Sequence, residues 1–297
     1  MSTESSPLPP SPQPAAGLVD HHGLPTLRLR AGDGAQATVL LQGAQLLSWI
    51  PAGGSEQLFV SPLARYAAGQ AVRGGVPVIF PQFEQRGPLP RHGFARNRSW
   101  QPVQRSQMPQ HAMAVLRLTD DEATRGIWPQ AFVCELTVSI GGARLDIELA
   151  VTHPGEPGAE PLRFTAALHT YLRVGDLRQA RLEGLRGTRY EDCAQGGRRD
   201  VEVDAELRIE DELDRIYFGG GRQPLMLREP GRRLAIAADG FADVVVWNPG
   251  ADKAAALADL GQQAWREMLC VEAAQIGTPV ELAPGAEWVG RQSLVAG

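Results

Sequence analysis

Apolar residues that recur at every second position are the strongest constraint on the fold of this chain. In residues 132–140 they alternate with mostly polar ones, and the alternation resumes in residues 145–151. A period of two places successive side chains on opposite faces of a strand, which leaves one face apolar. Gly141 and Gly142 lie between the two segments and accept the positive φ angles of a tight turn. The pattern therefore predicts an antiparallel hairpin.

Similar patterns cover much of the remaining chain. Further strands are predicted over residues 36–50, 113–119, 162–174, 201–209, 233–238, 243–247, 269–273, 278–282 and 286–294. Only residues 252–260 have the pattern of a helix, with Asp252 as its cap and Gly261 directly after its end. The 33 glycines and 23 prolines suit strands joined by tight turns. We therefore expect an all-β fold, a large antiparallel β-sandwich with one or two short helices.

The N-terminal residues differ in composition from the rest of the chain. Residues 1–22 are rich in proline and serine and offer few apolar side chains, which predicts a disordered tail. Residues 23–297 contain no internal repeat and no second zone of composition. They are therefore predicted to form a single domain.

Charge and cysteine usage exclude several classes of partner. A net charge of -5 without a long basic run argues against nucleic acid as a partner. No apolar run approaches the roughly 20 residues that span a bilayer, and the first residues do not resemble a secretory signal. Cys134, Cys193 and Cys270 form no CxxC pair and no cluster with zinc-ligand spacing. We expect a soluble, cytoplasmic protein without membrane contacts and without a bound metal.

Several motifs of well-known enzymes are missing from the sequence. It contains no GxxxxGK[ST] phosphate loop, no HExxH motif and no EF-hand loop. Residues 53–57 depart from the pattern of a nucleophile elbow at their last position. If the chain is an enzyme, it is expected to use acid–base chemistry without a nucleotide, a metal or another cofactor.

Two segments combine arginines with an irregular backbone. Arg73 is followed by two glycines, which let the backbone pass close to another group while the guanidinium reaches out. Arg91 and Arg96 lie on either side of His92 in a second such segment. Three forked cations can hold a dianion such as phosphate. The alternative is a set of solvated surface arginines, because all but one of the 29 cationic side chains are arginines.

Two predicted strands contain titratable residues at unusual places. His169 and Tyr171 share the polar face of the strand 162–174, which suits the lining of a cavity. An exposed, solvated histidine is the alternative. Glu272 interrupts the otherwise apolar residues 268–274. It therefore lies either at a sheet edge or partly buried with a raised pKa.

Taken together, these segments resemble the hexose-6-phosphate mutarotases, also called glucose-6-phosphate 1-epimerases, of the galactose-mutarotase-like superfamily. The resemblance extends over nearly the whole chain after the tail, and its motifs occur in the family's order with similar separations. These motifs lie at residues 43–49, 73–77, 92–96, 168–171, 214–217, 246–249 and 270–272.

The resemblance implies a β-supersandwich with the active site in a groove on one sheet, and it implies roles for seven residues. His169 matches the family's general acid, and Glu272 matches its general base. The remaining matches are Arg73, Arg91 and Arg96 as the sites that hold the phosphate, Asp214 as a ligand of sugar hydroxyls, and His92 as a second imidazole in the site.

Two positions depart from the family. Some relatives carry a neutral Gln where this chain has Arg91, so Arg91 either binds the phosphate or pairs with a carboxylate. Ala273 follows Glu272 where Pro is frequent among relatives. The second departure concerns the local backbone and not the carboxylate.

The implied activity is that of an isomerase that interconverts the α and β anomers of D-glucose 6-phosphate and related hexose 6-phosphates. Glu272 would take the proton of the C1 hydroxyl while a charged His169 donates a proton to the ring oxygen, and both groups would reverse roles as the ring closes. This scheme requires an imidazole pKa near 7 and an ionised carboxylate at neutral pH. A monomer is the usual state for this fold.

Other functions remain open at this point. An aldose 1-epimerase that acts on free hexoses would use the same acid and base but would not need the arginines. A non-catalytic sugar-phosphate binding protein would keep Arg73 and Asp214 and have no use for His169 opposite Glu272. A glycoside hydrolase fits less well, because it needs two positioned carboxylates.

Overall fold

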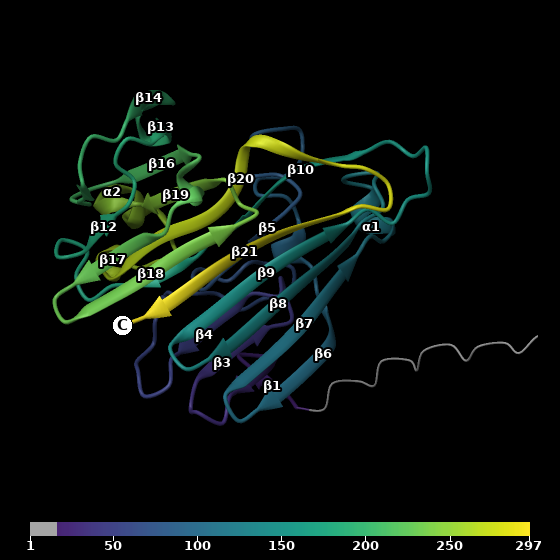
Figure 1. The fold of residues 1–297 in the computed structure, drawn as a ribbon, viewed down its shortest axis with the longest axis horizontal. Helices are drawn as coiled ribbons and strands as arrows, with labels where there is room; N and C mark the ends of the chain where they lie inside the picture. Colours follow the sequence, from purple (N-terminus) through teal and green to yellow (C-terminus); the bar gives the residue numbers. More distant parts are fainter. Residues whose placement is uncertain (1–16) are drawn as a thin grey trace, which may run out of the picture.

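Antiparallel strands dominate the computed structural model of this chain, which describes residues 17–297 (Figure 1). The strands form three sheets, and neighbouring strands within each sheet run antiparallel. The predicted all-β class, with large antiparallel sheets and short helices, is therefore confirmed.

The smallest sheet is a meander of four strands near the N-terminus. Its strands follow chain order, from β1 (Leu18–His21) and β2 (Leu24–Arg30) to β3 (Gln36–Leu40) and β4 (Leu46–Ile50). The predicted strand 36–50 is thus two strands, because the chain turns back between Leu40 and Leu46.

The largest sheet has nine strands and contains the predicted hairpin. Gly141 pairs with Arg144 at the turn between β8 and β9, as the two glycines indicated. In spatial order the strands are β15 (Glu206–Leu207), β12 (Arg181–Glu183), β17 (Leu225–Glu229), β18 (Arg232–Asp239), β21 (Glu287–Ala296), β9 (Arg144–Thr152), β8 (Val133–Gly141), β7 (His111–Thr119) and β6 (Gln101–Met108). Figure 1 shows most of them side by side as one broad, curved sheet.

The third sheet has eight strands. In spatial order they are β14 (Arg198–Val201), β13 (Arg189–Asp192), β16 (Leu213–Phe218), β19 (Asp243–Asn248), β20 (Met268–Leu282), β10 (Leu162–Leu168) and β5 (Val78–Ile79), with β11 (Tyr171–Arg173) also paired to β20. The predicted strands 269–273 and 278–282 are parts of β20. The predicted strand 162–174 is interrupted at His169 and Thr170, between β10 and β11.

Helices are few and short. The α-helices of residues 17–297 are α1 (Glu122–Arg125) and α2 (Gly250–Ala256). Single 3-10 turns occur at η1 (Ala95–Asn97), η2 (Cys193–Gln195), η3 (Gly220–Arg222) and η4 (Ala264–Glu267). Within the described residues, no helix has both the length and the apolar character needed to cross a membrane.

The helix α2 starts and ends earlier than the predicted helix 252–260. Asn248 Oδ1 accepts a hydrogen bond from the Gly250 N–H at 2.9 Å, while its amide nitrogen donates to the carbonyl oxygens of Trp265 and Met268. This buried Asn248 fixes the start of the helix, and Asp252 lies in its first turn without capping it. The predicted cap was therefore wrong, because Asn248, which Trp265 and Met268 hold in place, binds the first N–H of the helix instead.

Residues 201–209 also depart from the prediction of one continuous strand. Only Arg198–Val201 and Glu206–Leu207 are strands, and Val203 is 72% exposed whereas Glu202 is buried. Glu202 Oε2 accepts hydrogen bonds from Tyr217 Oη at 2.9 Å and from Arg215 Nη1 at 3.2 Å. These two bonds draw the carboxylate inward, which reverses the predicted faces at residues 201–203, whereas Leu207 and Ile209 are buried as the alternation indicated.

The predicted tail of residues 1–22 extends too far toward the domain. Residues 18–21 form β1, which pairs with β2 from Leu18↔Leu27 to His21↔Leu24. Residues 1–16 lie outside the described part of the chain. That residues 23–297 form a single domain stays a prediction.

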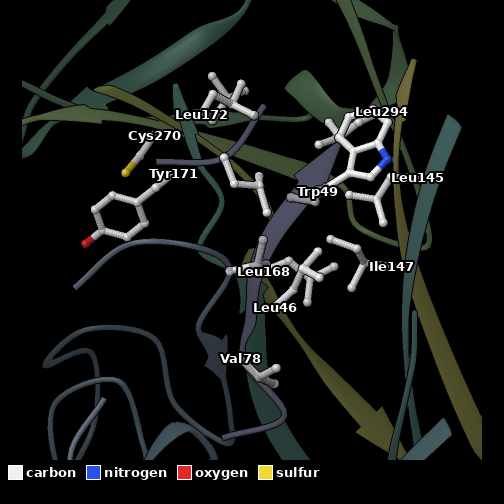
Figure 2. Packing of buried hydrophobic residues seen from close by; sticks show 14 of the residues in the cluster. Leu46, Trp49, Val78, Leu145, Ile147, Leu168, Tyr171, Leu172, Cys270 and Leu294 are labelled. Atoms are coloured by element: carbon white, nitrogen blue, oxygen red, sulfur yellow. The ribbon is translucent and has the colours of Figure 1, made fainter. Parts of the chain in front are cut away.

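Apolar side chains from all three sheets meet in one buried cluster. It includes Trp49 of β4, Ile147 of β9, Leu168 of β10 and Leu294 of β21. Figure 2 shows these side chains packed together. Burial of each such side chain contributes about 1.5–3 kcal/mol of transfer free energy. The cluster thereby holds the eight-stranded sheet against the other two.

Gly75 lies where the chain crosses β4. Its φ is +61°, and a Cβ at this position would lie 2.1 Å from the carbonyl oxygen of Leu46. The Val76 N–H donates to that same oxygen at 2.8 Å, so the two backbones are tied together. We expect Gly75→Ala to lower the free energy of unfolding by about 2–4 kcal/mol, measured by urea denaturation.

Gly53→Ala is the matched control. Gly53 has a similar φ of +67°, but nothing lies within 4 Å of the added Cβ. Gly53→Ala should lower the free energy of unfolding only by the cost of a positive φ at alanine, about 1–2 kcal/mol. Equal losses of stability in Gly75→Ala and Gly53→Ala would show that the close approach of Gly75 to β4 does not contribute to the loss.

Candidate active site

A cavity of about 620 Å³ opens over the eight-stranded sheet. All seven residues singled out in the sequence line it, although they come from distant segments. They are Arg73, Arg91, His92, Arg96, His169, Asp214 and Glu272. The structure therefore brings together every predicted site residue in one place.

The strand register explains why His169 and Glu272 meet. Leu168 pairs with Ala273 and Tyr171 pairs with Cys270, so His169 lies opposite Glu272 across the same two strands. Directly opposed residues on antiparallel strands point to the same face with their Cβ atoms about 4.5–5.5 Å apart. The departure from Pro at Ala273 does not disturb this pairing.

The same register continues across the sheet and forms the floor of the cavity. Glu272 pairs with Val245, which pairs with Ile216, and both of these apolar residues line the cavity. In the neighbouring row, Cys270 pairs with Trp247, which pairs with Asp214. Asp214 thus lies on the same face as Glu272, two strands away.

His169 and Glu272 are in direct contact and nearly excluded from solvent. The distance from His169 Nε2 to Glu272 Oε1 is 3.3 Å, and the side chains are 11% and 1% exposed. The second nitrogen of His169, Nδ1, and the second oxygen of Glu272, Oε2, have no hydrogen-bond partner among residues 17–297. The pair is therefore held by its surroundings and not by a second layer of hydrogen bonds.

Burial shifts the pKa values of His169 and Glu272 in opposite directions. It lowers the pKa of His169 well below its usual value, and the nearby His92 and the charges of Arg96 and Arg73 act in the same direction. It raises the pKa of Glu272 well above its usual value, helped by Asp214 and opposed by Arg96. The protein's own groups thus favour a protonated Glu272 beside a neutral His169. Both directions run against the expected imidazole pKa near 7 beside an ionised carboxylate.

Aromatic rings surround the imidazole of His169. The ring of Tyr171 stacks on it with 4.8 Å between centroids and an interplanar angle of 11°. Trp247 and His92 contact it edge-on, at 6.0 and 5.8 Å.

His92 is itself held in a strained loop. Its φ is +63°, and its Nδ1 accepts a hydrogen bond from the Glu84 N–H at 3.3 Å. Burial lowers the pKa of His92 to about 3, with further contributions from Arg96, Arg91 and Arg73. His92 is therefore a neutral imidazole at physiological pH.

The three arginines differ in how the protein holds them. Arg73 Nε donates to both carboxylate oxygens of Asp259 at 3.2 Å, and its Nη1 donates to Tyr171 Oη at 3.2 Å. Arg91 pairs with Glu84 at 2.8 Å and its side chain is 59% exposed. Of the two alternatives for Arg91, the structure therefore shows the pairing with a carboxylate.

Arg96 has no carboxylate partner among residues 17–297. Its Nη2 donates to the carbonyl oxygen of Arg91 at 3.2 Å, and its buried Nε has no partner in the described residues. Burial lowers its pKa, while Tyr171 acts in the opposite direction. Arg96 is thus the cation of the site whose charge is least compensated by the protein.

Asp214 lies beside the only lysine of the chain. Lys253 Nζ, from α2, is 2.9 Å from Glu212 Oε1 and 4.0 Å from Asp214 Oδ2. Burial raises the pKa of Asp214 to about 6, and the charge of Lys253 acts against this shift. The carboxylate is therefore mostly ionised at neutral pH and available to accept hydrogen bonds from hydroxyls.

Several cavity residues were missed from the sequence. Lys253 and Trp247 line the cavity, and Asp259 binds Arg73 from the turn after α2. The uniqueness of Lys253 was a usable signal, since every other cation is an arginine. Asp259 offered none, because it is one of 34 acidic residues and its partner is 186 positions away.

Comparison with known proteins gives consistent matches. The family described as aldose 1-epimerase matches residues 25–295. A protein of Cenchrus ciliaris named "Putative glucose-6-phosphate 1-epimerase" is 35% identical, over 96% of this chain and 89% of that protein. A protein of Escherichia coli K12 with the same name is 33% identical, over 80% of this chain and 79% of its own. The crystal structure of a "putative mutarotase" from Salmonella typhimurium covers 97% of this chain and 96% of that one, with a TM-score of 0.85 and 28% identity.

The raised pKa of Glu272 predicts that its carboxylate destabilises the fold at neutral pH. A group whose pKa is higher in the folded protein contributes stability below its unfolded pKa, and this contribution is lost as the pH rises through the folded value. Glu272→Gln cannot ionise, so it should raise the free energy of unfolding at pH 8 by about 1–3 kcal/mol. The gain should disappear near pH 4, where glutamate is largely protonated in both states. Urea denaturation at the two pH values measures this.

Glu281→Gln is the control for that measurement. Glu281 lies on the same strand but its side chain is 73% exposed, so the change should stay within about 0.5 kcal/mol at both pH values. A Glu272→Gln protein that is less stable at pH 8 would contradict the assignment of a protonated carboxyl.

Proposed function

This chain belongs to the aldose 1-epimerase family, and on that premise we propose that it interconverts the α and β anomers of D-glucose 6-phosphate. The observation that carries the proposal is the buried contact of 3.3 Å between His169 and Glu272, in a cavity that arginines also line. An acid and a base side by side are what the opening and closing of a sugar ring requires. Related hexose 6-phosphates also carry an anomeric carbon and a phosphate, and they are proposed as further substrates.

The anomeric carbon of a sugar carries two oxygens, the ring oxygen and the C1 hydroxyl. A pair of neighbouring protein groups can therefore exchange protons with both oxygens at once. His169 Nε2 faces the ring oxygen and Glu272 Oε1 faces the C1 hydroxyl in the proposed complex. Glu272 takes the hydroxyl proton, His169 gives a proton to the ring oxygen, and the C1–O5 bond breaks to leave an aldehyde. Rotation about C1–C2 and reversal of both transfers produce the other anomer.

The proton that this cycle needs is already in the pair. Burial favours its position on Glu272, and the charges of Arg96 and Arg73 likewise disfavour a charged His169. A phosphate dianion beside Arg73 and Arg96 compensates two of the charges that lower the pKa of His169. Binding of the phosphorylated substrate thereby favours transfer of the proton from Glu272 to His169, which prepares the acid and the base together.

The arginines support a phosphorylated substrate over a free sugar. Arg96 has no carboxylate partner, and Arg73 keeps Nη2 without a hydrogen-bond partner in residues 17–297. A dianion bound by Arg73 and Arg96 supplies binding energy at a place remote from C1. This binding energy orients C1 against the acid and the base. Asp214 and His92 are proposed to bind sugar hydroxyls, since both line the same cavity.

We also propose that the protein is a cytoplasmic monomer. Support for the location comes from Cys134, Cys193 and Cys270, which are all free thiols, as expected in a reducing compartment. The monomer is the expectation carried over from the sequence.

Removal of the proposed acid or base should abolish most of the acceleration. We expect His169→Ala and Glu272→Gln each to lower kcat for anomer exchange of glucose 6-phosphate by about 10²–10⁴-fold. Magnetisation-exchange NMR between the two anomers, at substoichiometric protein, measures this rate. His111→Ala, on β7 and outside the cavity lining, is the matched control and should keep wild-type turnover. No acceleration by folded wild-type protein would support a sugar-phosphate binding protein instead.

The arginines predict a difference between substrates. Arg96→Ala should raise KM for glucose 6-phosphate by about 10- to 100-fold, because a charge-assisted contact to the dianion is lost. Its effect on any activity with free glucose should be within about twofold. Arg91→Ala should raise KM by less than about threefold, since Arg91 is exposed and already paired with Glu84. Equal losses on both sugars in Arg96→Ala would show that Arg96 is structural and would favour an epimerase of free hexoses.

A further inference from the structure

The imidazole of His169 is oriented in an unusual way for an acid–base group. The backbone at His169 is fixed, because its N–H donates to the carbonyl oxygen of Pro77 at 3.0 Å. Its ring, however, has no hydrogen-bond partner at Nδ1 among the described residues. An acid–base imidazole is commonly oriented by a hydrogen bond at its second nitrogen. In this protein the imidazole must instead be oriented by the rings that pack around it.

Tyr171 is the ring with the largest contact of this kind. It stacks nearly parallel on His169, at 4.8 Å and 11°, whereas Trp247 and His92 touch only at an edge. A parallel ring restricts rotation of the imidazole about its own bond to Cβ, because any rotation would drive the two rings into each other. The plane of the imidazole, and with it the direction of Nε2 toward Glu272, therefore follows the plane of Tyr171.

Tyr171 is in turn held at its other end by an arginine. The ring is buried, and Figure 2 shows its hydroxyl pointing away from the apolar side chains of Leu168 and Leu172. The hydroxyl oxygen accepts a hydrogen bond from Arg73 Nη1 at 3.2 Å. Arg73 is also bound at Nε by Asp259, so its guanidinium has contacts on two sides.

A second, smaller cavity adjoins the first at this position. It has a volume of about 290 Å³, and its lining includes Arg73, Arg96, His169 and Tyr171, all of which also line the larger cavity. Tyr171 therefore borders both cavities. It is hydrogen-bonded to Arg73 and stacked on His169, so it connects the two residues directly.

We propose that Tyr171 is a positioning residue that links the phosphate-binding arginine to the acid–base histidine. Its ring sets the plane of the His169 imidazole, and its hydroxyl sets the place of the Arg73 guanidinium. The proposal rests on the proposed function, because it assigns Arg73 to the anion and His169 to proton transfer. The rigid tyrosine ring then keeps a constant spacing between the anion and the reacting carbon.

Two substitutions separate the two contacts of Tyr171. Tyr171→Phe keeps the stacked ring and removes only the hydroxyl that Arg73 binds. We expect KM for glucose 6-phosphate to rise about 5- to 10-fold with kcat within twofold. Tyr171→Leu removes the ring as well, so kcat should fall by at least about tenfold, because a misplaced acid loses its alignment with the ring oxygen.

Tyr66 offers a matched control elsewhere in the chain. Its ring also stacks on a histidine, His22, at 4.4 Å and 22°, but neither residue lines the active-site cavity. Tyr66→Phe and Tyr66→Leu should leave both kcat and KM within twofold of wild type. Equal kcat losses in Tyr171→Phe and Tyr171→Leu would overturn the assignment of the ring to the imidazole.

A double-mutant cycle tests the link to the arginine. If Tyr171 acts on substrate binding through Arg73, Tyr171→Phe should change KM by less than twofold in an Arg73→Ala background. Independent, additive effects on KM would overturn the link. The cycle uses the same anomer-exchange measurement as the single variants.

Inorganic phosphate provides a test that does not depend on turnover. We expect it to bind wild-type protein in calorimetry and to shift the ring signals of His169 in NMR spectra of histidine-labelled protein. Tyr171→Phe should weaken phosphate binding about 5- to 10-fold. Tyr171→Leu should change the His169 signals, whereas Tyr66→Leu should change only those of His21 and His22. Undetectable phosphate binding, or equal binding by wild type and Tyr171→Phe, would overturn the proposal. A failure of the epimerase function would instead appear as no anomer exchange with wild type.

Discussion

The backbone pairing of β20 with its neighbours is the constraint on which the site depends. Beyond a shift between Phe164 and Ala166, one register carries β20 past the end of β10, the residues His169 and Thr170, and then β11. Thr170 maintains it where the strand assignment is interrupted, because its carbonyl accepts from the Val271 N–H at 3.1 Å and its hydroxyl bonds to buried Gln292 at 2.5 Å. A shift of one residue would turn Glu272 to the opposite face of the sheet. The acid–base contact is thus a property of the register.

Electrostatics in the cavity follow from burial and from uneven compensation of charge. Two of the arginines have carboxylate partners, Asp259 for Arg73 and Glu84 for Arg91, while Arg96 has none in the described part of the chain. Removing a charge from water is costly, so partners reduce the cost of the cluster without removing its attraction for a dianion. The uncompensated charge lies close enough to His169 to lower its pKa. Substrate charge and proton position are therefore coupled within one cavity.

The large apolar cluster offsets the free-energy cost of burying these charged groups. Side chains from all three sheets pack beneath the site, including Leu168 directly before His169 and Val271 directly before Glu272. Because alternate residues of a strand point to opposite faces, these neighbours anchor each strand in the core while the functional side chains face the cavity. A rigid floor of this kind suits a reaction that needs two groups held at a constant spacing.

The sequence by itself determined the all-β class, the hairpin at Gly141–Gly142 and seven of the residues that line the cavity, since alternation, turn glycines and motifs are local features. It did not determine the inward position of Glu202, the hydrogen bonds that hold Asn248 before α2 or the pairing of Arg73 with Asp259, because each depends on partners distant in the chain. The protonation of His169 and Glu272 was likewise decided by the tertiary structure. A pKa depends on burial and on nearby charges, and only the folded chain brings Arg73, Arg96 and His92 around that pair.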